Sequence, residues 1–427
     1  MICVLFLQTD ILQLDVTWLY DSFVGNGNTS NDEVKRVKES LDQDIQKDIT
    51  AASMSSTKVY KAAELSQSCL SWDELKGMKL ASYAPTAILS NHSKVRYCIL
   101  GTSFISGVMV DAIRASDCGE VYCVCGRTAK TLKEFSDKYD ISVTYTDYND
   151  MLNDPSVDVV YIGLPTLMHA DWVINCATAG KHVLNEKSFA ITAADTRRAI
   201  DVVRHEGVFC MEAQMFRCHP ILKKLMSLVH TELPVGSVQS VNATFTADII
   251  NLFNRKAGGS ILDLGCYPMS LLRLLFGEPK AMTGSAILVK PEKEGDNVFD
   301  SASTAEITME SGLRATIFTS NNATHNWEFH IQCENGRISL SDLWRSDVED
   351  AITITSVDKS GNKVEEKILM PLSQNFYTLQ INTVNENIRN GKCQATSPAM
   401  SWDDSISNMV ALDMWRRAIG LNYDGYE

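Results

Sequence analysis

The chain has 427 residues, of which 45% are hydrophobic and 22% charged, and its formal net charge is −14. This length is enough for two domains with their own cores. The acidic balance argues against nucleic acid or an anionic membrane as the main partner, and no apolar run approaches the roughly 18 residues of a membrane helix. The scattered cysteines lack the spacing of zinc sites, so we expect no metal and reduced thiols in a cytoplasmic protein.

Residues 1–93 form an N-terminal extension without recognisable chemistry. Its first residues, MICVLFLQTDILQL, are apolar, but no basic residue precedes them and Asp10 interrupts them, which makes a poor secretory signal. Residues 31–50 are highly charged and have few apolar positions. This composition predicts a partly helical or disordered extension.

From residue 94 the pattern becomes an alternation of strands and helices. Helical segments at 128–139, 169–180 and 192–207 separate apolar runs of strand length, which read YCIL, VYCVC, VDVVYIGL, HVLNE and VFCMEA. Such alternation predicts a parallel, doubly wound sheet, so we expect a Rossmann domain over residues 94–217. Ligands of these sheets bind at the carboxyl ends of the strands.

After residue 218 the pattern changes to strands that alternate apolar and polar residues between positions 238 and 357. They predict a large, mostly antiparallel sheet with one face open or covered by helices. A long helix at 260–277 interrupts them, and Pro268 inside it predicts a kink or a late start. With two closing helices, residues 218–427 are expected to form an α+β domain.

The turn GTSFIS, after the first strand, resembles a dinucleotide-binding turn in which Gly101, Ser103 and Ser106 occupy the glycine positions of G-x-G-x-x-G. Gly101 keeps the tight turn, the Ser103 hydroxyl can donate to a phosphate, and Ser106 is small enough for helix packing. The following helix presents free N–H groups to an anion. The turn therefore predicts a dinucleotide site, and the alternative is that the serines serve packing alone.

The second strand of this unit ends in Gly126 and Arg127, with no carboxylate nearby. A carboxylate here would accept from the ribose 2′-hydroxyl of NAD, whereas a guanidinium pairs with the 2′-phosphate of NADP. The sequence favours NADP(H), with NAD(H) possible. The alternative is that Arg127 is a surface cation that stacks on the adenine.

Three segments together resemble the glucose-fructose oxidoreductase, inositol dehydrogenase and MocA (Gfo/Idh/MocA) family: GTSFIS, VDVVYIGLPTLMHADWVINCATAGKHVLNEKSFA and AGGSILDLGCYPMSLLRLLFG. The resemblance covers residues 94–422. Tyr267 is similar to the branch with dimeric dihydrodiol dehydrogenase, since inositol dehydrogenases carry histidine there. Besides the two serines of the turn, Ser188 replaces the proline of E-K-P, and Thr166 replaces the usual asparagine.

The resemblance implies an NAD(P)-dependent oxidoreductase that acts on a CH–OH group of a sugar, polyol or cyclic diol. It makes Lys187 and Tyr267 the catalytic pair and lets Asp263 orient the substrate or the tyrosine. Hydride transfer needs a proton moved at the reacting oxygen and negative charge stabilised there. A lysine ammonium can do the second and can lower a neighbouring tyrosine's pKa. Asp263 and Tyr267 are four residues apart and share a helix face.

Each candidate also has a purely structural alternative. Lys187 could be a surface lysine, Asp263 a helix N-terminal carboxylate and Tyr267 a half-buried core tyrosine. The expected cofactor-binding residues are Gly101, Ser103, Phe104, Ile105, Arg127, Pro165, Thr166, His169, Glu186, Lys187 and Arg217. Of these, His169 and Arg217 are expected to shape the nicotinamide pocket. A second class of function also stays open, a non-catalytic dinucleotide-binding sensor or regulator. We expect a small polyhydroxylated or diol substrate, and a homodimer or higher homo-oligomer through the C-terminal sheet.

Overall fold

The computed structural model describes residues 93–250, 258–290, 298–341, 350–358, 360–370 and 374–422. All of them belong to one compact unit, Tyr60–Glu427. The extension predicted over residues 1–93 lies outside the described residues, except for Ser93. Every cysteine in the described part of the chain is a free thiol, and no helix there is long and apolar enough to cross a membrane.

The first sheet has six strands in the order β3-β2-β1-β4-β5-β6, and all of its neighbours are parallel. Its strands are β1 (Val95–Leu100), β2 (Gly119–Cys125), β3 (Val143–Tyr145), β4 (Val159–Ile162), β5 (His182–Glu186) and β6 (Cys210–Ala213). The predicted doubly wound sheet is confirmed. The short β3 was missed because its three residues include no buried side chain and form no apolar run.

Helices connect these strands on both faces of the sheet. They are α5 (Phe104–Arg114), α6 (Ala129–Lys138), α7 (Tyr148–Asn153), α8 (His169–Thr178) and α9 (Ala193–Glu206). α9 is capped at its start, since the Thr192 side chain accepts from Asp195 N, and it ends at Gly207, where the sequence predicts its end. α6 begins after Thr128 as expected, although the Thr128 side chain makes no capping hydrogen bond.

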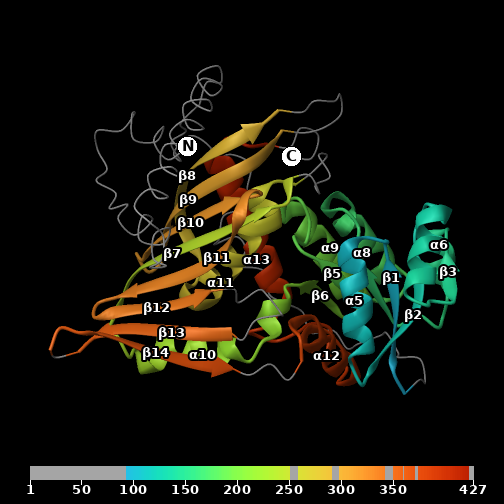
Figure 1. Ribbon diagram of the computed structural model, residues 1–427. Helices are drawn as coiled ribbons and strands as arrows, with labels where there is room; N and C mark the ends of the chain where they lie inside the picture. Colours follow the sequence, from blue (N-terminus) through green and yellow to red (C-terminus); the bar gives the residue numbers. More distant parts are fainter. Residues whose placement is uncertain are drawn as a thin grey trace, which may run out of the picture. The chain divides into compact units, whose positions relative to one another are not determined.

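The second sheet has eight strands in the order β14-β13-β12-β11-β7-β10-β9-β8, and Figure 1 shows them stacked in this order. They are β7 (Val238–Asp248), β8 (Pro279–Val289), β9 (Phe299–Met309), β10 (Arg314–Ser320), β11 (Asn322–Cys333), β12 (Gly336–Ser341), β13 (Asp350–Val357) and β14 (Lys363–Met370). Only β10 and β7 pair in parallel. The mostly antiparallel sheet is therefore confirmed, and the unpredicted β14 is charged and largely exposed.

The helix predicted over 260–277 consists of a π-helical turn, η6 (Ile261–Gly265), and α11 (Cys266–Phe276). Regular α-helix begins only at Cys266, so Pro268 lies in its first turn, where a missing N–H costs little. The late helix start predicted from Pro268 is thus present in the structure.

The remaining helices are η2 (Thr166–Met168), η3 (Met215–Cys218), α10 (Ile221–Ser227), η4 (Leu228–Glu232), α12 (Phe376–Arg389) and α13 (Trp402–Ala418). α12 follows the second sheet in sequence but packs on α5 of the first, where Tyr97 donates to Asn385 Oδ1 at 2.7 Å. α13 contacts α9 and β8, and so lies between the two sheets (Figure 1).

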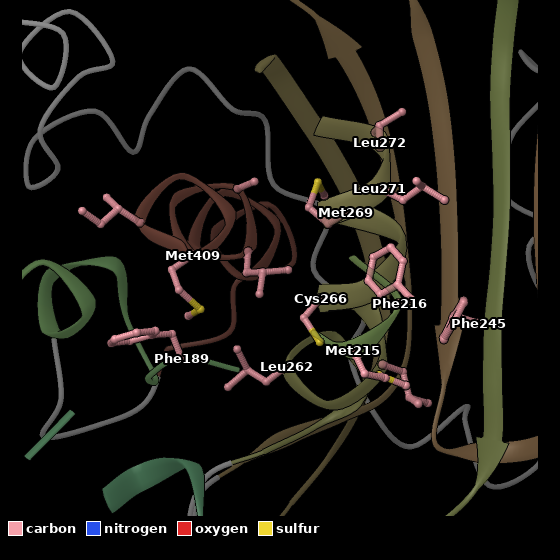
Figure 2. Packing of buried hydrophobic residues seen from close by; sticks show 14 of the residues in the cluster. Phe189, Met215, Phe216, Phe245, Leu262, Cys266, Met269, Leu271, Leu272 and Met409 are labelled. Atoms are coloured by element: carbon pink, nitrogen blue, oxygen red, sulfur yellow. The ribbon is translucent and has the colours of Figure 1, made fainter. Parts of the chain in front are cut away.

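The two sheets share one hydrophobic core around η6 and α11. Figure 2 shows Phe189, after β5, and Met409 of α13 on one side of Leu262 and Cys266, and Phe245 of β7 on the other side. This packing fixes η6 and α11 against the carboxyl end of β5, where the predicted site residues lie.

Candidate active site

The turn after β1 has the geometry of a dinucleotide-binding turn. Gly101 has φ +106°, and a Cβ atom there would lie 2.8 Å from the carbonyl oxygen of Gly163. Gly101 N donates to Cys125 O at 2.8 Å, which ties the turn to the end of β2. A larger residue would be strained and would clash with the backbone after β4, so glycine is required here.

The two serines of the turn make hydrogen bonds within the protein. Ser103 is the N-cap of α5: its Oγ accepts from Ser106 N at 3.3 Å and lies 2.9 Å from Ser106 Oγ. Ser106 is buried, and its hydroxyl would meet a Cβ atom at Gly163 at 2.7 Å. The close-packing glycine is instead Gly107, where a Cβ atom would lie 2.0 Å from the Tyr139 hydroxyl. Gly107 was not predicted, because it lies outside the three standard glycine positions of G-x-G-x-x-G.

The first turn of α5 is open to a ligand. Phe104 is 89% exposed, Ile105 is partly exposed, and the turn carries no acidic residue. Its backbone N–H groups and the positive end of the helix dipole therefore favour an anion at this point.

Arg127 lies exposed at the carboxyl end of β2, beside the Tyr148 hydroxyl. Burial raises the pKa of Tyr148, and its hydrogen bonds with Arg127 oppose that rise. Tyr148 packs edge-on against Trp172, with ring centroids 4.6 Å apart. The guanidinium thus lies beside this aromatic pair and remains accessible to a ligand.

The turn after β4 contains Pro165, which is exposed, and Thr166, which is partly buried. His169 follows but is only 1% exposed, with Nδ1 2.8 Å from Ser188 O and Nε2 2.8 Å from Leu164 O. Burial lowers the pKa of His169. Since almost none of its surface is accessible, we assign it to bracing two strand-end turns rather than to direct ligand contact.

Glu186 and Lys187 stand at the carboxyl end of β5. The Glu186 carboxyl accepts from the Tyr161 hydroxyl at 2.8 Å and from Lys187 N at 3.2 Å. Burial raises the pKa of Glu186. This buried pair fixes the backbone from which the Lys187 side chain extends.

Lys187 and Ser188 hold two successive carbonyl groups of η6. Lys187 Nζ donates to Asp263 O at 2.7 Å, and Ser188 Oγ donates to Leu262 O at 2.7 Å. A proline at position 188 would have no hydroxyl for the second bond. The departure from E-K-P therefore adds a link between the first sheet and η6.

Tyr267 lies at the start of α11 among aromatic side chains, with its ring centroid 6.1 Å from that of Phe216 and 5.7 Å from that of Phe245. Lys187 Nζ lies 5.2 Å from the Tyr267 ring centroid. The expectation that Lys187 lowers the pKa of Tyr267 is wrong for this arrangement. Burial raises the pKa of Tyr267 well above 10, and the neighbouring Tyr377, Glu186 and Asp263 add to the rise. The Lys187 ammonium lies over the ring and donates to Asp263 O rather than to the phenol.

A second tyrosine, Tyr377 of α12, belongs to the same surroundings. It adds to the rise in the pKa of Tyr267, and its own pKa is raised by burial and by Glu186. No local motif marks Tyr377, because it is far from Lys187 in the sequence and reaches the site only through the return of α12 to the first sheet.

Asp263 uses its carboxyl at the start of η6. Its Oδ2 accepts from Gly259 N at 3.0 Å, and burial raises its pKa while Lys187 opposes the rise. This geometry fits the alternative that Asp263 is a carboxylate at a helix N-terminus. The structure thus brings Asp263, Lys187 and Tyr267 together, with Glu186 behind them.

The expectation that Arg217 shapes the nicotinamide pocket requires correction. Arg217 is 0% exposed, so no ligand can touch it. Its guanidinium donates to Ser270 Oγ at 2.7 Å, to Asp404 Oδ1 at 3.1 Å and to Pro398 O. We assign it a structural role that links η3 to α11 and to the start of α13.

Two family models match the chain. "Oxidoreductase family, NAD-binding Rossmann fold" matches residues 95–214, and "GFO/IDH/MocA C-terminal domain" matches residues 233–339.

Characterised proteins and solved structures are also similar. D-xylose 1-dehydrogenase (NADP(+)) 2 of Haloferax volcanii is 29% identical over 323 residues, 74% of this chain and 94% of that protein. Trans-1,2-dihydrobenzene-1,2-diol dehydrogenase of Sus scrofa is 34% identical over 199 residues, 45% of this chain and 59% of the relative. A 3-ketoreductase from Actinomadura kijaniata, solved with NADP and TDP-benzene, has a TM-score of 0.67 at 22% identity, covering 76% of this chain and 98% of its own.

Proposed function

The chain belongs to the Gfo/Idh/MocA oxidoreductase family, and from this we propose that it transfers hydride between NADP(H) and a CH–OH carbon. We propose as its substrate a sugar, polyol or cyclic diol, in keeping with the names of the xylose and dihydrodiol dehydrogenases similar to it. One observation carries the proposal: Lys187 Nζ lies 5.2 Å from the Tyr267 ring at the carboxyl end of β5. Nothing in this arrangement depends on the altered glycines of the turn.

The proposed cofactor fits the residues at the strand ends. Gly101 leaves room for the close approach of a pyrophosphate, and the N–H groups at Phe104 and Ile105 face an anion. Arg127 would pair with the 2′-phosphate, and Pro165 and Thr166 would line the path towards Glu186 and Lys187. When bound, the nicotinamide supplies or accepts the hydride. The residues of the chain must then manage the proton and the charge on the substrate oxygen.

Tyr267 is the proposed acid–base group, and Lys187 the group that stabilises charge on the same oxygen. The raised pKa of Tyr267 keeps the phenol protonated near neutral pH, which suits a proton donor to a carbonyl. Alcohol oxidation needs the phenolate instead, so it requires the Lys187 ammonium to move from Asp263 O towards the hydroxyl. Asp263 is proposed to orient the substrate.

The proposed homo-oligomer would form through the second sheet. Its outer strands β8 and β14 expose apolar side chains, among them Ile287, Leu288, Val364 and Leu369. Mass measurement by light scattering tests this, because a monomer at micromolar concentration would contradict it.

A fluorescence titration with NADPH, followed by a panel of aldoses, polyols, cyclic diols and their carbonyl counterparts, tests the function. NADPH binding with turnover of at least one compound supports the enzyme. Tight NADPH binding without turnover of any compound would favour the sensor or regulatory protein instead.

A further inference from the structure

The start of η6 is fastened by a buried carboxyl group that the proposed mechanism does not use. Asp300, the second residue of β9, is 0% exposed. Its Oδ2 accepts from Ser260 Oγ at 2.6 Å and from Ile261 N at 2.9 Å. The Ser260 hydroxyl also lies 2.9 Å from Thr319 Oγ1 of β10. Two strands of the second sheet therefore hold the first residues of the turn that carries Asp263.

Gly259 lets this carboxyl approach the backbone. It has φ +136°, and a Cβ atom there would lie 2.2 Å from Asp300 Oδ1. The same glycine is bonded twice to Asp263, since Gly259 N donates to Asp263 Oδ2 and Asp263 N donates to Gly259 O, each at 3.0 Å. Asp300 thus packs against the backbone of Gly259, and the same glycine is hydrogen-bonded to Asp263.

This arrangement costs folding free energy. Asp300 Oδ1 has no hydrogen-bond partner in the described part of the chain. Burial raises the pKa of Asp300 to about 7 against the opposing bonds from Ser260 and Ile261, and Asp263 is the charged group that adds to the rise. Buried groups with strongly shifted pKa values cluster at functional sites, and a buried oxygen without a partner calls for an explanation.

On its opposite side, η6 contacts the residues that follow β5. The carbonyl groups of Leu262 and Asp263 accept from Ser188 and Lys187, respectively. A shift of η6 would therefore move the Lys187 ammonium. It would also move Tyr267, which follows Asp263 by four residues.

We propose that Asp300 is a positioning residue of the active site. By accepting hydrogen bonds from Ser260 and Ile261, it fixes η6 in the position in which Asp263 O accepts from the Lys187 ammonium beside Tyr267. This inference rests on the proposed function. Asp300 does not touch the substrate, and it acts through the backbone from Gly259 to Asp263.

The test compares Asp300→Ala and Asp300→Asn with Ser303→Ala as a matched control. Ser303 lies on the same strand, and its hydroxyl is bonded to Trp415 Nε1 and Ser285 O, so its loss weakens β9 while the bonds from Ser260 and Ile261 to Asp300 remain. Each variant is measured for NADPH affinity by fluorescence, and for kcat and KM per NADPH-binding site. Because a displacement of about 1 Å can cost roughly 10²-fold, Asp300→Ala should lose about 10–100-fold in kcat with NADPH affinity nearly unchanged.

Asp300→Asn should retain most of the activity, because its amide oxygen can still accept from Ser260 and Ile261. Equal kcat in Asp300→Ala and Ser303→Ala would overturn the proposal and leave Asp300 a purely structural residue. If Asp300→Ala is insoluble, Ser260→Ala decides: a lower kcat at unchanged NADPH affinity supports the proposal, and an unchanged kcat overturns it.

Failure of the proposed function would be seen separately, as a wild-type protein that turns over none of the panel. In that case hydrogen exchange replaces the kinetic measurement. Amides of residues 261–267 should lose protection in Asp300→Ala and keep it in Ser303→Ala. Equal protection in both variants would overturn the positioning role.

Discussion

The Lys187 ammonium lies over the Tyr267 ring, 5.2 Å from its centroid, and donates its 2.7 Å hydrogen bond to the carbonyl of Asp263 rather than to the phenol. The pair is thus close enough to act on one oxygen, yet the free protein keeps Tyr267 protonated. This relationship explains why positioning of η6 matters and why the direction of the reaction is a separate question from the identity of the catalytic pair.

Cofactor choice is expected to depend on Arg127. Arg127→Asp should weaken NADPH binding by roughly 10–100-fold, because a charge-assisted bond to the 2′-phosphate is worth about 1.5–3 kcal/mol. NADH binding should change much less. Fluorescence titration with both cofactors measures this, with Lys130→Asp as control, since Lys130 is exposed on α6 and pairs only weakly with Glu134. Equal losses for NADPH and NADH in Arg127→Asp would contradict the assignment.

Ser188 is expected to contribute to stability. Ser188→Ala removes the hydroxyl that donates to Leu262 O at 2.7 Å and leaves a buried acceptor unpaired. The free energy of unfolding should fall by roughly 1–3 kcal/mol. Urea denaturation measures it, and an unchanged midpoint would mean that water replaces the hydroxyl. Ser311→Ala, in the exposed turn between β9 and β10, is the matched control and should be neutral.

Arg217 should matter for folding and not for the cofactor. Arg217→Met leaves Asp404 without its buried partner and should destabilise the protein by about 3–5 kcal/mol. The fraction that remains folded should bind NADPH with normal affinity. The control is Arg204→Met, which breaks a more exposed pair with Asp201 and should cost far less. A variant that is stable but does not bind NADPH would restore Arg217 to the cofactor site.

Most of the fold could be predicted from the sequence, because strand-length apolar runs and capped helices determine both sheets locally. Among the parts missed, β3 and β14 lack that signal: β3 has three residues, and β14 is charged and exposed. The short helices α7 and α10 were also missed. The site was predicted in part. Motifs place Lys187, Asp263 and Tyr267, whose catalytic roles stay predictions. The contributions of Tyr377 and Asp300 arise from contacts between distant segments, which periodicity and local motifs cannot reveal.

The burial of Asp300 predicts a pH dependence of stability. Its pKa rises from 3.8 to about 7 on folding, so between these values the unfolded chain has released a proton that the folded protein still binds. Stability from this group is present at low pH and is lost as pH rises towards 7. Asp300→Asn lacks the effect, and the other titrating groups cancel in the comparison.

From pH 5 to pH 8 wild type should therefore lose roughly 2–4 kcal/mol relative to Asp300→Asn. Chemical denaturation of both proteins at the two pH values measures the difference. A constant difference between the two proteins would show that Asp300 ionises normally in the folded state.

The central claim is that Tyr267 moves the proton, and Tyr267→Phe tests it most directly because only the hydroxyl is removed and the packing against Phe216 and Phe245 is kept. With NADPH prebound and a substrate from the panel, single-turnover hydride transfer should slow by roughly 10²–10⁴-fold while NADPH affinity stays unchanged. The control is Tyr145→Phe: Tyr145 ends the edge strand β3, and its hydroxyl donates to Asp154. This variant should transfer hydride at the wild-type rate. A wild-type rate in Tyr267→Phe would remove this tyrosine from the mechanism and contradict the account.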